Sequence, residues 1–207
     1  YVISSYHPAP DGKKVAFAVA PNGSESSILH IMNVDEGTLY PEQIDRCWYP
    51  SCSWLPDNES FFFNRLNSGD VHEMDREKDS KVYIHKVGEA PATDVEFFSR
   101  QNNPSLNILP EEFPILYYDR ESDHLLGLSL SVDNRVKAWY APTSNLDPAT
   151  VEWKLLFEKA DDVHDFYSTD THFYLLTPKD APNYKILRIP TADPLLSNAE
   201  VVVPEFA

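Results

Sequence analysis

The stretches "PAPDGKKVAFAV" (8–19) and "SWLPDNESFFFNR" (53–65) carry the same pattern twice. In each copy a proline–aspartate turn leads directly into an apolar, aromatic-rich run that is typical of a β-strand. Asp11 and Asp57 hold the same place in the two copies, 46 positions apart by their residue numbers. Such a spacing indicates an architecture built from copies of one supersecondary unit.

Strand patterns continue along the chain in four cycles. They fall at 14–19, 28–34 and a weaker, proline-interrupted 38–44; then at 47–54, 60–65, 81–87 and 94–99; then at 124–131, 135–141 and 151–157; and finally at 172–177, 184–190 and 199–204. The middle strands contain Ile31, Tyr83, Trp139 and Leu187, which are separated by 52, 56 and 48 positions. No segment predicts an α-helix, and the polar stretch 69–81 is interpreted as an insertion loop.

Four strands per cycle, at a period near fifty, are typical of β-propeller blades. A plain antiparallel sandwich would show turn signals without the longer period. We therefore predict an all-β fold, a β-propeller portion of about four four-stranded antiparallel blades, at approximately 1–45, 46–103, 104–160 and 161–207. The pattern leaves open whether the four blades close a ring of their own or belong to a larger one.

The charge balance disfavours two classes of partner. The chain has 17 Lys and Arg against 33 Asp and Glu, for a formal net charge of −16. A surface of this sign repels phosphate backbones and anionic headgroups, so we expect neither nucleic acid nor membrane binding. Hydrophobic residues make up 42% of the chain, which supports a sizeable core and argues against disorder.

Residue patterns for chemistry are missing from this sequence. No G-x-S-x-G nucleophile elbow and no glycine-rich phosphate loop occurs. Cys47 and Cys52 form a single C-x4-C pair, which predicts two free thiols and no zinc site. "DDVHD" (161–165) and "DVHEMDREKD" (70–79) place histidine among carboxylates, and we interpret both as solvated loops. We predict no catalytic residue, no metal and no cofactor in this chain.

Five stretches together resemble the propeller of the prolyl oligopeptidase family, serine peptidases of family S9. They are "HPAPDGKKVAFAVAPNGSE" (7–25), "DRCWYPSCSWLPDNESFFFNR" (45–65), "DSKVYIHKVG" (79–88), "KDAPNYKILRI" (179–189) and "VVVPE" (201–205). The resemblance implies a seven-bladed propeller that caps an α/β-hydrolase domain holding the catalytic triad, a domain absent from this chain. It also implies a cytoplasmic or periplasmic protein whose propeller admits short peptides and excludes folded proteins.

One substrate-binding residue follows from the resemblance. The family has an aromatic side chain three positions after an arginine on a first strand, where it reaches the substrate, and Tyr49 after Arg46 matches it. Trp54, five positions further on, is interpreted as a core residue. The family's substrate-holding arginine has no counterpart in "LLGLSLS" (125–131), which leaves the peptide specificity open.

The leading functional hypothesis is a non-catalytic gating propeller of a prolyl oligopeptidase-type peptidase. Its partners would be the hydrolase domain of the same protein, short peptide substrates and, through exposed blade faces, further copies of the chain. Two alternatives stay open: a closed four-bladed binding module, and the propeller of another S9 peptidase of the oligopeptidase B or dipeptidyl peptidase type.

Overall fold

The computed structural model describes residues 1–21, 26–47 and 51–206. They form two compact units, Tyr1–Leu116 and Tyr117–Ala207. Within the described residues there is no α-helix, and the helical segments are single 3-10 turns. In that same part of the chain, no helix has the length and apolar character needed to cross a membrane.

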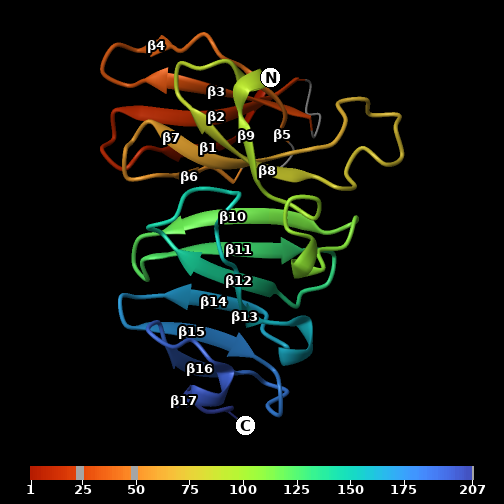
Figure 1. Ribbon diagram of the computed structural model, residues 1–207, viewed down its shortest axis with the longest axis vertical. Coiled ribbons are helices and arrows are strands. Elements are labelled where there is room, and N and C mark those ends of the chain that lie inside the picture. The colour runs from red at the N-terminus through yellow and green to blue at the C-terminus, as the bar shows by residue number, and fades with distance from the viewer. Residues whose placement is uncertain (22–25, 48–50, 207) are drawn as a thin grey trace. The chain divides into compact units, whose positions relative to one another are not determined.

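Seventeen strands of the described residues make four sheets (Figure 1). The first sheet holds β1 (Val2–Pro8), β2 (Lys14–Ala20), β3 (Ser27–Asn33), β4 (Thr38–Leu39) and β5 (Ile44–Cys47). The second holds β6 (Ser53–Trp54), β7 (Ser60–Arg65), β8 (Lys81–Lys86) and β9 (Val95–Phe98). The third holds β10 (Phe113–Asp119), β11 (His124–Leu130), β12 (Lys137–Pro142) and β13 (Lys154–Phe157). The fourth holds β14 (Asp165–Ser168), β15 (His172–Thr177), β16 (Lys185–Pro190) and β17 (Glu200–Val203).

The strands of the second, third and fourth sheets follow one another in chain order, as do β1 to β4 of the first, where β5 pairs with β3. The registers are antiparallel. The four residues that tracked the period lie on the third strand of their sheets, each opposite a second-strand residue. The pairs are Ile31 with Ala16, Tyr83 with Phe63, Trp139 with Gly127 and Leu187 with Leu175. The predicted all-β fold of antiparallel, blade-like sheets is confirmed.

The two copies of the opening pattern have the same turn geometry. In both, the backbone N–H before the turn donates to the carbonyl after it at 2.8 Å. Gly12 and Asn58 supply the positive φ that the turn needs, at 73° and 57°. The side chains of Asp11 and Asp57 each accept the N–H two residues on, at 3.0 Å. The repeat in sequence is therefore a repeat in local hydrogen bonding.

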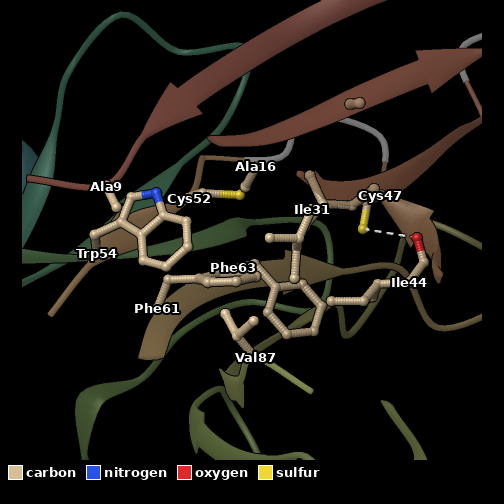
Figure 2. Close-up of a cluster of buried hydrophobic side chains, with 12 residues drawn as sticks. Ala9, Ala16, Ile31, Ile44, Cys47, Cys52, Trp54, Phe61, Phe63 and Val87 are labelled. Atoms are coloured by element: carbon tan, nitrogen blue, oxygen red, sulfur yellow. Dashed lines mark hydrogen bonds between the residues drawn. The ribbon is translucent and has the colours of Figure 1, made fainter. Parts of the chain in front are cut away.

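A shared core joins the first two sheets (Figure 2). Ala16 and Ile31 of the first sheet and Phe61 and Phe63 of the second are all fully buried in one cluster. Trp54 belongs to it as well, packs on Phe61 at 4.8 Å between ring centroids and donates its indole N–H to a backbone carbonyl at 2.8 Å. This placement agrees with the core interpretation of Trp54.

Strand boundaries differ from the prediction where proline or missing alternation weakened the pattern. The interrupted strand at 38–44 is split into β4 and β5, which both pair with β3 around the break at Pro41. Of the stretch 47–54, Cys47 ends β5 and Ser53–Trp54 forms β6, while 48–50 lies outside the described residues. The first strands of the third and fourth sheets, β10 and β14, were not among the predicted strands.

Candidate functional site

Tyr49, the one predicted substrate-binding residue, lies outside the described residues, so its role stays a prediction. Three positions before it, Arg46 has a positive φ of 61° and donates from Nη1 to the carbonyl of Asn67 at 3.1 Å. Its side chain also lies 3.4 Å from the Asp45 carboxylate. The residue that precedes the predicted aromatic position is thus held in a defined conformation.

Asp45 on β5 links the segment before Tyr49 to β7. Partial burial works against ionisation, but the guanidinium groups of Arg65 and Arg46 outweigh it and hold the pKa of the Asp45 carboxyl below its usual value. Arg65 donates directly to Asp45. The carboxylate therefore stays charged and keeps two arginines beside the chain segment that leads to Tyr49.

A second candidate is a cleft of about 470 Å³ in the second unit. We call it the inner-strand groove, because β10 and β14 are first strands, which line the central channel in a propeller. Its lining comes from the end of β10, from β11 and from β14: Tyr117, Tyr118, Asp119, Leu126, Leu128, Asp165, Phe166, Tyr167 and Ser168. The size falls within the range of small-molecule and side-chain pockets.

Aromatic rings and carboxylates dominate the chemistry of the inner-strand groove. Tyr167 is 74% exposed and Tyr117 is 38% exposed, so both can be reached from solvent. Partial burial raises the pKa of the Tyr117 hydroxyl further above its usual value of 10.0. Asp119 accepts a hydrogen bond from the Ser122 hydroxyl, and Asp165 Oδ1 accepts the N–H of Phe166 at 2.9 Å.

Sequence reasoning missed this groove because it missed β10 and β14, two of the three strands that form it, although it predicted the third, β11, at 124–131. "FPILYYD" (113–119) and "DFYS" (165–168) each have aromatic residues at adjacent positions, which obscures the alternation of a strand, and the second stretch has only four residues. The available signal was the position of each stretch, directly before the second strand of its cycle.

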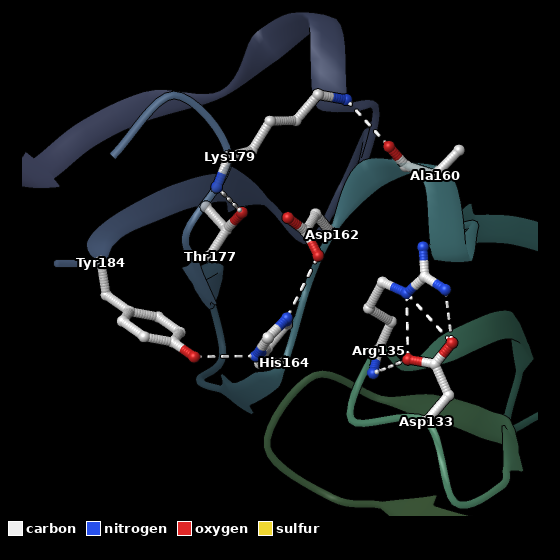
Figure 3. Close-up of polar contacts among 8 residues, drawn as sticks. All are labelled: Asp133, Arg135, Ala160, Asp162, His164, Thr177, Lys179 and Tyr184. Carbon is white, nitrogen blue, oxygen red and sulfur yellow. Dashed lines mark hydrogen bonds and ion pairs between the residues drawn. The ribbon is translucent and has the colours of Figure 1, made fainter. Parts of the chain in front are cut away.

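The histidine of "DDVHD" is hydrogen-bonded into a polar corner (Figure 3). His164 Nε2 lies 3.1 Å from Asp162 Oδ1, and its Nδ1 lies 3.0 Å from the Tyr184 hydroxyl. Asp162 and Tyr184 both have positive φ, at 60° and 70°. The contacts fix two strained loop residues to one ring, which is a structural role for this motif.

The other histidine loop, 69–81, is held by local contacts. Asp70 accepts the backbone N–H of His72 at 2.9 Å, and Lys78 pairs with Asp75 at 2.7 Å. Across the described residues, no three His, Cys, Asp or Glu side chains gather in a way that could hold a metal ion. Cys47 and Cys52 are free and buried, and burial raises the pKa of Cys47 to about 12, so this thiol stays protonated.

A buried ionisable cluster that the sequence did not reveal joins the first two sheets. His85 on β8 is fully buried, with its Nδ1 2.7 Å from Asp94 Oδ1 and its Nε2 3.7 Å from Glu42 Oε1. Glu42 precedes β5 and also accepts the N–H of Gly88 at 2.7 Å. Side chains of this kind are buried only when paired, so the cluster fixes the β4–β5 connection against the second sheet.

The comparisons with known proteins agree with the sheet architecture. The family model for the prolyl oligopeptidase N-terminal β-propeller domain matches residues 1–207. The chain belongs to this family. Prolyl oligopeptidase A of Amanita bisporigera is 22% identical over 97% of the chain, and the dual function macrocyclase-peptidase POPB of the same fungus is 21% identical over 96%.

Solved structures show the same fold at low identity. A prolyl endopeptidase structure superposes on 100% of the chain with a TM-score of 0.82 at 23% identity. The superposed part is 29% of that protein. Prolyl oligopeptidase B of Galerina marginata, bound to a 35mer hydrolysis and macrocyclization substrate, superposes with a TM-score of 0.78 at 17% identity. The match covers 99% of the chain and 29% of the Galerina protein. The chain spans 28% of the curated prolyl oligopeptidase A it matches.

Proposed function

We propose that this prolyl oligopeptidase-family propeller gates the access of short peptides to the active site of a serine peptidase. The observation that carries the proposal is the family match over the whole chain, which coincides with four antiparallel sheets. The catalytic serine, histidine and aspartate would lie in an α/β-hydrolase domain of the same protein, which would be the main partner of the propeller. The chain itself would supply no reacting group.

A propeller can exclude large substrates only if its sheets keep their positions relative to one another. Side chains such as Phe61 and Trp54 lock neighbouring sheets together through close packing, which resists small displacements. A ring of such sheets admits an extended peptide through its central channel and excludes a folded chain. The 35mer bound to the Galerina enzyme supports a peptide as the class of substrate.

Self-association is part of the proposal, because one apolar face of the first sheet is only half covered. Val15, Phe17 and Val19 alternate along β2 with fully buried neighbours. Apolar faces of this kind are usually covered by a partner surface. The partner would be a further blade or the hydrolase domain in the intact protein, and a second copy when the chain is alone.

The gate is tested on the full-length protein that carries this chain, with proline-containing peptides of increasing length. We expect kcat/KM to fall steeply with length. Trp54→Ala, which removes packing between two sheets, should restore cleavage of long peptides and leave the shortest peptide unaffected. Val95→Ala, at a 50% exposed position of the outermost strand β9, is the control and should change neither. Equal cleavage of short and long peptides by the unaltered protein would contradict the proposal.

A further inference from the structure

The inner-strand groove combines features that no residue role described so far explains. It is the 470 Å³ cleft formed by β10, β11 and β14. We propose that it is a binding site for the cationic side chain, arginine or lysine, of a peptide that passes along the first strands. The proposal rests on the gating function above and adds a preference of the gate for one chemical class of peptide.

The charges that line the groove all have one sign. Asp119 and Asp165 contribute carboxylates, and no Lys, Arg or His is among the lining residues. Within the described part of the chain, neither aspartate forms an ion pair with a basic side chain, and Asp165 Oδ2 has no hydrogen-bond partner. Such a site attracts a cation and repels an anion, more strongly in a cleft than on an open surface.

The aromatic rings suit the same ligand. Tyr117, Phe166 and Tyr167 line the groove beside the two carboxylates, and Tyr167 remains 74% exposed. A guanidinium or ammonium group over such a ring gains a favourable interaction, and the planar guanidinium also stacks on it. The aliphatic stem of either side chain can cover the apolar surface of Leu126 and Leu128.

The backbone of a peptide also has a place to bind. In the described strand order, β10 pairs with β11 alone and β14 pairs with β15 alone, so each first strand has one edge without a strand partner. An extended peptide can hydrogen-bond along such an edge and direct alternate side chains into a neighbouring pocket. The occupant is therefore an extended, positively charged peptide segment.

The test measures binding of short fluorescent peptides to the purified chain by fluorescence anisotropy. Three peptides differ at one central position, which is arginine, glutamine or glutamate. We expect the arginine peptide to bind about tenfold or more tightly than the glutamate peptide, a ratio typical of one charge pair with a ring contact. Added salt should reduce this preference.

Substitutions locate the site. Asp165→Asn should remove most of the preference for arginine, and Tyr167→Ala should weaken the arginine peptide more than the glutamine peptide. Glu152→Gln, an exposed carboxylate outside the groove, is the charge-matched control and should change nothing. Thermal melts establish that each variant is folded. If Asp165→Asn does not fold, Asp119→Asn serves as the second variant.

Two results would overturn the inference: equal binding of the arginine and glutamate peptides, or an arginine preference that both Asp165→Asn and Asp119→Asn leave intact. The gate itself is assayed with uncharged peptides of increasing length. A failed charge preference with intact length selection therefore refutes the groove alone, and a lost length selection refutes the gate.

Discussion

Strands β2 and β7 begin with the same turn and occupy the same place in their sheets, yet they are buried differently. Along β2, fully buried residues alternate with half-buried ones. Along β7, five successive residues, from Ser60 to Asn64, are buried. The sequence differs accordingly, because "KVAFAV" has small alanines on its covered face, while "SFFFN" has large rings on both.

Packing partners explain the difference. Phe61 and Phe63 face the cluster shared with the first sheet, whereas Phe62 faces the other way and meets Phe97 at 4.9 Å between ring centroids. Asn64 lies on that second face as well and donates to the carbonyl of Pro114 at 2.8 Å. The sheet of β7 is thus covered on both sides, and the comparison indicates that the outer face of β2 is a packing surface without its full cover.

Two matched phenylalanines should show the largest difference. Phe62→Ala removes a fully buried ring and should lower the free energy of unfolding by about 3–5 kcal/mol. Phe17→Ala, on the half-buried face of β2, should cost about half as much or less, because the site remains open to water. Urea denaturation of both variants measures this, and equal losses would break the comparison.

The next test of the difference between the two sheets compares two histidines, each on the third strand of its sheet. His85→Leu would leave the buried carboxylates of Asp94 and Glu42 without their partner, which should cost about 3 kcal/mol. His30→Leu on β3 removes a half-buried ring stacked on Phe17 and should cost less than about 1 kcal/mol. Denaturation at neutral pH separates the two, and a His85→Leu variant as stable as His30→Leu would refute a structural role for the cluster.

Substitutions in the two matched turns should lower the free energy of unfolding by similar amounts, and by less than the substitution of His85. Gly12→Ala and Asn58→Ala each force a side chain without local hydrogen bonding into a positive φ, which should cost about 1 kcal/mol. Asn58→Gly should be nearly neutral, because glycine accepts this conformation. Thermal melts of the three variants give the ranking, and a large loss for Asn58→Gly would mean that its side-chain contact to Asp11 matters more than its backbone.

The smallest effect concerns pH. Burial lowers the pKa of His30 below its usual value of 6.5, so below that pH the unfolded chain binds a proton that the folded chain does not. Stability should therefore fall as the pH drops through 6.5 and level off below the folded pKa. His30→Phe keeps the ring contact with Phe17 and should lose this part of the acid sensitivity. Denaturation from pH 7.5 to pH 5 checks the difference, and parallel profiles would contradict it.

The sequence predicted the sheets where the pattern was long and regular, and failed where tertiary contacts decide. Ile31, Tyr83, Trp139 and Leu187 located the third strand of every sheet, because those strands are six or seven residues long and rich in apolar and aromatic side chains. β14 has four residues and takes its place from pairing with β15, which no local pattern records. His85 and Asp94 lie in and beside neighbouring strands of the second sheet, but Glu42 is distant in sequence and meets His85 only through the packing of two sheets.

The central claim is that the half-covered face of β2 and β3 is a packing surface, and sedimentation equilibrium of the purified chain tests it most directly. We predict concentration-dependent association that Phe17→Glu abolishes while the monomer stays folded by circular dichroism. Tyr167→Glu, at an exposed aromatic outside the first sheet, is the control and should leave the association intact. A chain that stays strictly monomeric at high concentration, or association that Phe17→Glu does not reduce, would contradict the account.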